Sequence, residues 1–143
     1  MFITPEHKNL VVPYIIIDDV EHFLDFAEKV FETRIEGVVK RKNGTILHAE
    51  VSINETLIFL GEADEKSDIF PASLFIYVPN CDDVYNACLK NGARSIMKPK
   101  DVWHTGERFG GIADPFGNIW WIASVKEKLT FRQQQERVNN SLE

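Results

Sequence analysis

The chain has 143 residues, of which 44% are hydrophobic and 27% charged, an ordinary globular balance rather than a disordered one. No apolar stretch approaches the roughly 18 residues of a membrane span, and the first residues lack the pattern of a signal peptide. The formal net charge of −6 disfavours a nucleic-acid partner, so we expect a soluble cytoplasmic protein that binds neither nucleic acid nor membrane.

The first half of the chain predicts a strand, a helix and three further strands. The apolar run 10–17 is rich in β-branched residues and is typical of a strand. Asp18 or Asp19 can then cap a helix over about 20–31. Its apolar stripe comprises Val20, Phe23, Leu24, Ala27, Val30 and Phe31. We expect the remaining strands near 34–41, 45–53 and 56–61, with an Asn43-Gly44 turn between the first two.

The second half repeats this order of elements. Residues 72–78 form a strand pattern, and Asn80 is suited to cap a helix that ends at Asn91-Gly92. The loop 98–107 contains Trp103 and His104, and its length suits a lid over a pocket. We expect the last strands near 93–97, 108–113 and 118–124, with the turn 114–118 before the final one.

The two cysteines, Cys81 and Cys88, both fall on the second predicted helix. Seven residues of helix place their Cα atoms about 10 Å apart. That distance is too long for a disulfide, so we expect two buried thiols and a reducing compartment.

A shift of 61 residues places Tyr14 on Phe75 and Asp19 on Asn80, so the chain reads as a tandem βαβββ repeat. We therefore predict an α+β fold in which the two repeats form a cupped mixed sheet within a single domain, 1–143. Repeat one covers about 9–61 and repeat two about 72–125. The tail, 129–143, is either a C-terminal helix on a subunit surface or partly disordered.

Strand alternation predicts which side chains face the cup. The apolar residues Leu47, Ala49, Val51 and Ile53 should pack under the first helix. Leu74, Ile76 and Val78 should pack under the second. The opposite, concave face is then aromatic, with one polar pair: Tyr14, His48, Glu50, Phe59, Phe75, Tyr77 and Trp121. Such a set either lines a small-molecule pocket or simply fills the space between the sheets.

Three stretches resemble the glyoxalase/bleomycin-resistance/dioxygenase superfamily, and within it the PhnB-like branch. They are 13–19, His48-Ala49-Glu50 and 108–121, the last with its Asp-Pro-Phe-Gly-Asn turn. The resemblance covers roughly 9–125 and implies the vicinal-oxygen-chelate fold, in which two sheets curl into a cup and the chain forms a homodimer.

The resemblance also implies where a metal would bind. Metal-dependent members place ligands at four strand positions, which are held here by Val12, Phe59, Ser73 and Trp121. The Val, Phe and Trp side chains offer no lone pair that a divalent ion can use, and the serine offers only a neutral hydroxyl. We therefore expect no metal and no other cofactor.

The leading hypothesis is a protein that binds an aromatic or amphipathic small molecule. One alternative is a metal-dependent lyase or dioxygenase with a shifted ligand set, and another is a metal-free isomerase; both would use His48 and Glu50, the latter as an acid–base pair. These two residues can equally hydrogen-bond each other, and Arg108 can form a structural salt bridge with Glu107 or Asp114. The candidate ligand-binding residues are Tyr14, His48, Glu50, Phe59, Phe75, Tyr77, Trp103, Arg108 and Trp121.

Overall fold

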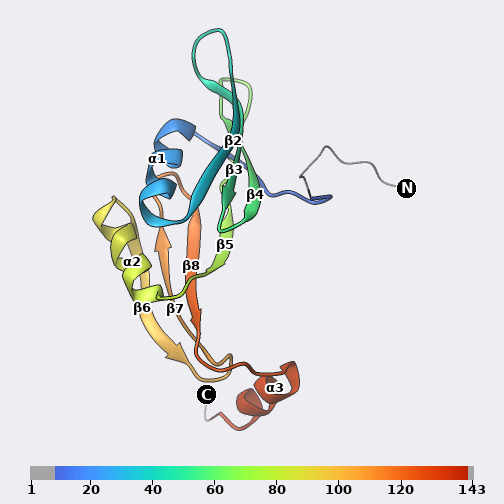
Figure 1. Cartoon of the computed structure of the whole chain (residues 1–143), viewed down its shortest axis with the longest axis vertical. Helices are drawn as coiled ribbons and strands as arrows, with labels where there is room; N and C mark the ends of the chain where they lie inside the picture. Colours follow the sequence, from blue (N-terminus) through green and yellow to red (C-terminus); the bar gives the residue numbers. More distant parts are fainter. Residues whose placement is uncertain (1–8, 142–143) are drawn as a thin grey trace. The chain divides into compact units, whose positions relative to one another are not determined.

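Each half of the chain folds into its own four-stranded mixed sheet with one helix packed against it, as the computed structural model shows for residues 9–141 (Figure 1). The contacts divide the chain into two units, Met1–Ala72 and Ser73–Glu143. The first unit contains β1 (Tyr14–Ile17), α1 (Val20–Val30), β2 (Thr33–Lys40), β3 (Ile46–Ile53) and β4 (Thr56–Glu62). The second contains β5 (Ser73–Tyr77), α2 (Cys81–Lys90), β6 (Arg94–Val102), β7 (Glu107–Ala113), β8 (Ile119–Val125) and α3 (Phe131–Asn139).

The two sheets have the same topology. The strand order is β1-β4-β3-β2 in the first and β5-β8-β7-β6 in the second, and in each the first strand runs parallel to the fourth. The other pairings are antiparallel. The predicted α+β fold, its βαβββ repeat and its C-terminal helix are thus confirmed. None of the helices within 9–141 is long and apolar enough to cross a membrane.

The first helix forms where the capping signal and the apolar stripe predict it. Asp19 caps α1, and its carboxylate accepts a hydrogen bond of 3.1 Å from the backbone N–H of His22. All six residues of the predicted stripe are buried, and Phe26 is buried with them. The helix packs on β3 and β4, which bury Ala49, Val51 and Leu60.

One residue of β3 departs from the predicted alternation. Leu47 was expected under α1, but its side chain is 48% exposed and Ile46 is buried instead. Lys40 pairs with Ile46 while the adjacent Val39 pairs with His48, so Leu47 has no partner on β2. This is a β-bulge, and the extra residue reverses the alternation on its far side.

The core of the second unit is organised around a buried carboxylate. Asp114 directly follows β7, and its two oxygens accept hydrogen bonds of 2.9 Å from the backbones of Phe116 and Asn118, the Asn118 amide and the Trp120 indole. The Asp-Pro-Phe-Gly-Asn turn is therefore fastened to the first residues of β8. Because Asp, Pro, Gly and Asn are typical turn residues, the turn could be predicted from the sequence.

The strand β6 is longer than predicted, and the predicted lid loop over 98–107 is wrong. The strand runs to Val102, which leaves only residues 103–106 as a turn. Pro99 lies in a register shift between Met97 and Lys100 on this edge strand, where a missing N–H costs no ladder hydrogen bond. A Cβ atom at Gly110 would lie 2.9 Å from the Pro99 nitrogen, so glycine makes room for the bulge.

Candidate functional site

Four of the candidate residues form a cluster on the first sheet, on the face opposite α1. Tyr14 pairs in register with Phe59, which pairs on its other side with Glu50. The His48 ring lies 4.9 Å from the Phe59 ring and 6.3 Å from the Tyr14 ring, measured between centroids. His48 Nε2 lies 2.8 Å from Glu50 Oε2, and both side chains are partly buried. This first cluster is thus two rings beside a histidine–carboxylate pair.

A second cluster, of rings alone, lies on the corresponding face of the second sheet. Phe75 has its ring centroid 5.3 Å from that of Tyr77 and 5.5 Å from that of Phe109. The Phe109 and Trp121 rings are perpendicular, at 6.3 Å. Phe75 and Tyr77 remain 46% and 56% exposed, so the rings do not bury one another.

Phe109 was missed from the sequence, although it belongs to this second cluster. The signal that could have identified it is its register, because Phe109 pairs with Ala123, which pairs in turn with Tyr77. The glycines that follow it obscured the alternation of the strand. Gly111 has its own role there, since the Trp121 ring lies against its backbone and a Cβ atom would come within 2.5 Å of that ring.

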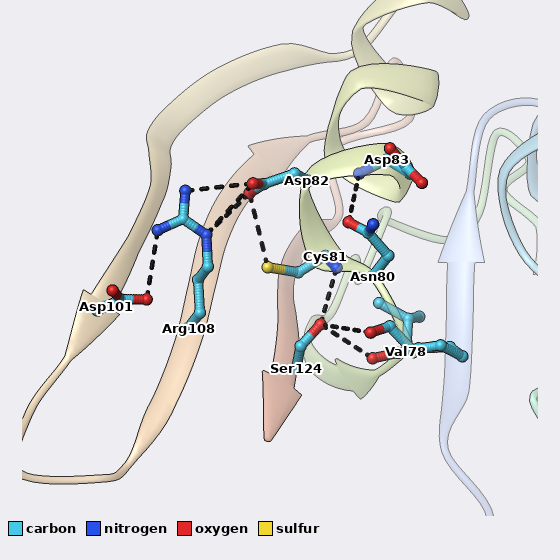
Figure 2. A network of polar contacts seen from close by, with 9 residues as sticks. Val78, Asn80, Cys81, Asp82, Asp83, Asp101, Arg108 and Ser124 are labelled. Carbon is cyan, nitrogen blue, oxygen red and sulfur yellow. Dashed lines mark hydrogen bonds and ion pairs between the residues drawn. The ribbon is translucent and has the colours of Figure 1, made fainter. Parts of the chain in front are cut away.

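Arg108 does not belong to either cluster, because alternation along β7 turns it toward α2. Its guanidinium contacts both carboxylate oxygens of Asp82 at 3.1–3.3 Å and one oxygen of Asp101 at 3.3 Å (Figure 2). The predicted partners Glu107 and Asp114 were wrong, since strand pairing brings Asp101 beside Arg108. The two carboxylates hold the pKa of the guanidinium above its usual value. A side chain fixed in this way supports the structural role.

The same region anchors the start of α2. The Ser124 hydroxyl accepts a hydrogen bond of 2.8 Å from the backbone N–H of Cys81 and donates to the carbonyl of Val78 (Figure 2). Cys81 and Cys88 are both buried and free, as predicted. Figure 2 therefore shows a structural network that joins α2 to β6, β7 and β8.

Trp103 lies apart from both clusters, in the turn between β6 and β7. Its side chain is 60% exposed, and the Arg137 guanidinium of α3 lies 4.8 Å from the centre of its ring. The structure thus brings seven of the nine candidates into two clusters, one in each unit, and leaves Arg108 and Trp103 outside them.

The four positions that the resemblance assigns to metal ligands do not fit a divalent cation. Val12, Phe59 and Trp121 offer no donor atom, and Ser73 is a single neutral hydroxyl. Within residues 9–141 no group of three or more His, Cys, Asp or Glu side chains is arranged to hold a metal. His48 and Glu50 supply two donors, fewer than a shifted site would need.

The duplicated βαβββ unit with a ring-bearing open face defines a class of protein. The family model of the Glyoxalase/Bleomycin resistance protein/Dioxygenase superfamily matches residues 9–122, and the chain belongs to that superfamily. An uncharacterized protein of Mycobacterium bovis is 28% identical over 140 residues, which cover 90% of this chain and 91% of that protein.

Two solved structures show the same fold at low sequence identity. The PhnB protein of Bacillus cereus is 15% identical with a TM-score of 0.69, over 82% of this chain and 100% of that one. The fosfomycin resistance protein FosX of Listeria monocytogenes, solved with Mn(II) and sulfate, is 13% identical with a TM-score of 0.66, over 92% and 98%.

Proposed function

We propose that this protein binds a small aromatic or amphipathic molecule and uses no catalytic metal. The observation that carries the proposal is the second cluster, in which four touching rings include two that are about half exposed. Contiguous exposed rings on a sheet are typical of a ligand site, since water contact with them is unfavourable. A ligand ring stacked there would gain about 0.5–1.5 kcal/mol per aromatic pair beyond the area it buries.

The first cluster is a second candidate binding surface, on the first unit. Its His48–Glu50 pair offers a hydrogen-bond donor and an acceptor next to the Tyr14 and Phe59 rings. A pocket with many apolar groups and few polar ones usually takes its specificity from the polar ones. The family name, with its resistance proteins, agrees with capture of small organic molecules.

We also propose a homodimer in the cytoplasm. Several apolar side chains of β2 are exposed, namely Ile35, Val38 and Val39, and an exposed apolar edge strand is commonly covered by a partner. The two buried free thiols suit a reducing compartment.

Ligand-observed NMR with a panel of planar aromatic compounds tests the binding proposal. Compounds that bind should lose at least about tenfold in affinity on Trp121→Ala, since the stacking surface is removed. The matched control is Phe131→Ala, which removes an exposed ring of α3 that does not belong to the cluster. Equal affinities of Trp121→Ala and the wild type would contradict the proposal.

Elemental analysis of protein purified without a chelating tag tests the metal-free part separately. We expect less than stoichiometric metal. A stoichiometric ion would instead support the shifted ligand set on His48 and Glu50.

A second candidate function, metal-free isomerisation or elimination, is favoured by the 2.8 Å contact between His48 and Glu50. A histidine held by a carboxylate can accept a proton from a bound substrate. Its test is a pH–rate profile on any compound the panel identifies. The rate should disappear in both His48→Ala and Glu50→Gln while binding survives; an unchanged rate in either variant excludes this mechanism.

A further inference from the structure

Trp103 is an exposed ring that is nevertheless fixed in place. Its backbone carbonyl accepts a hydrogen bond of 2.6 Å from Arg137, whose guanidinium also lies over one face of the indole. Arg137 is itself held by both carboxylate oxygens of Glu127, at 2.8 and 3.0 Å. Because one face is occupied and the residue is still 60% exposed, the indole offers its other face as a rigid platform.

The turn that carries Trp103 is tied to the segment after β8. The carbonyl of Gly106 accepts hydrogen bonds from the backbone N–H groups of Lys126, at 3.0 Å, and Glu127, at 2.8 Å. Gly106 has a φ of +73°, and a Cβ atom there would lie 2.8 Å from the Glu127 carbonyl, so glycine permits this close approach. The result is a hollow of about 570 Å³ that is lined by Trp103, Lys126 and Glu127, among others.

The charged residues that line this hollow differ in whether they have a partner within the protein. Its acidic residues all have partners: Asp101 contacts Arg108, Glu127 contacts Arg137, and Glu107 accepts a hydrogen bond from the Tyr77 hydroxyl. Lys126, in contrast, forms no ion pair with any residue of the described chain. Lys126 is therefore a cation of this hollow with which a ligand can pair without displacing another residue.

A neighbouring hollow holds further basic side chains. It is also about 570 Å³, shares Asp101, Val102 and Trp103 with the first, and is further lined by Lys100, His104 and Arg137, among others. Arg137 lines this second hollow, whereas Lys126 lines the first.

We propose that the hollow between Trp103 and Lys126 binds a planar aromatic anion, whose ring stacks on the indole and whose carboxylate pairs with the Lys126 ammonium. This site lies wholly in the second unit and uses none of the rings of the second cluster. It is thus additional to the proposed function and does not depend on it.

The probe is 2-naphthoate, titrated into the ¹⁵N-labelled full chain. The three tryptophan indole N–H signals are assigned from Trp103→Phe, Trp120→Phe and Trp121→Phe variants, so the two candidate sites report separately. We expect the Trp103 signal to shift and saturate. The uncharged 2-naphthamide should bind about fivefold more weakly, the factor that a single exposed charge pair supplies.

Lys126→Gln should weaken 2-naphthoate by about the same fivefold and leave 2-naphthamide unchanged. Lys128→Gln is the matched control, because it removes the same charge from an exposed lysine two residues away, and it should change affinity by less than about twofold. Both lysines are exposed, so neither substitution threatens folding.

Three results would overturn the inference: no response of the Trp103 signal, equal affinities in Lys126→Gln and Lys128→Gln, or equal binding of the charged and uncharged probes. A response at Trp121 alone would also overturn it while supporting the proposed function. A response at Trp103 with none at Trp121 supports the new site, and it does so even if the second cluster binds no ligand.

Discussion

Asp114 shows how a single buried side chain can organise a whole unit. It is 5% exposed and accepts hydrogen bonds from two backbone N–H groups, the Asn118 amide and the Trp120 indole. A carboxylate with this many donors is well compensated for its burial, and its removal takes away the acceptor of four hydrogen bonds at once.

We therefore expect Asp114→Ala to lower the free energy of unfolding by about 3 kcal/mol or more, since several buried donors lose their acceptor together. Urea unfolding followed by tryptophan fluorescence measures the change. Asp83→Ala, which removes an exposed carboxylate of α2, should cost less than about 1 kcal/mol. Similar losses in the two variants would show that the Asp114 network contributes little.

Cys88 gives a residue-level prediction about pH. Burial, and to a smaller extent the charge of Asp114, raises the pKa of its thiol to about 12. The unfolded chain therefore releases this proton at lower pH than the folded one. The stabilisation is complete below the ordinary thiol pKa of about 8.5 and is lost as the pH rises toward 12.

Urea unfolding at a series of pH values from 8 to 11 tests this. Cys88→Ala should flatten the decline in stability above about pH 9, because it removes the titrating group. Cys81→Ala provides the comparison for the loss of a buried thiol. An identical decline in Cys88→Ala and the wild type would contradict the assignment.

At the scale of elements, three strands, β5, β7 and β8, supply the rings of the second cluster. Gly111 on β7 lies opposite Trp121 on β8, and the missing side chain lets the indole lie against the β7 backbone. The position of the ring is therefore set by a glycine on another strand.

Gly111→Ala should displace the Trp121 ring, because the new methyl group would lie 2.5 Å from its nearest ring atom. We expect a destabilisation of about 1–3 kcal/mol and a shifted Trp121 indole resonance. Gly37→Ala is the matched control, since no atom lies within 4 Å of the new Cβ. An unmoved Trp121 resonance in Gly111→Ala would show that the ring is positioned by other contacts.

At the scale of the whole molecule, the two units each have a core of their own and an open, apolar sheet face. In the first unit the edge strand β2 leaves the apolar side chains of Ile35, Val38 and Val39 exposed, and a partner chain would cover them. This is the reason to expect self-association.

Sedimentation equilibrium should accordingly give twice the chain mass of 16.4 kDa over a wide range of protein concentration. The expected physical cause is burial of apolar surface, so the dimer should persist at high salt, where pairs of exposed charges are screened. A monomer at every concentration would contradict the homodimer.

Local signals allowed most of the fold to be predicted. The caps at Asp19 and Asn80, the apolar stripe of α1 and the Asp-Pro-Phe-Gly-Asn turn act within a few residues, so they are legible in sequence. The repeat then gave the order of elements and, with it, the faces of Tyr14 and Phe75. These features depend on the spacing of residues within one segment of the chain, and this spacing can be read from the sequence.

Contacts between strands decided the rest. The bulge at Leu47, the extension of β6 past Pro99, the contact of Arg108 with Asp101 and the place of Phe109 all depend on which residues lie opposite one another. A bulge moves every later side chain to the other face, and it arises from hydrogen bonding with a distant segment rather than from local preference. The sequence by itself determined the elements and their repeat; the register between strands, which only the tertiary structure supplies, decided which side chains meet.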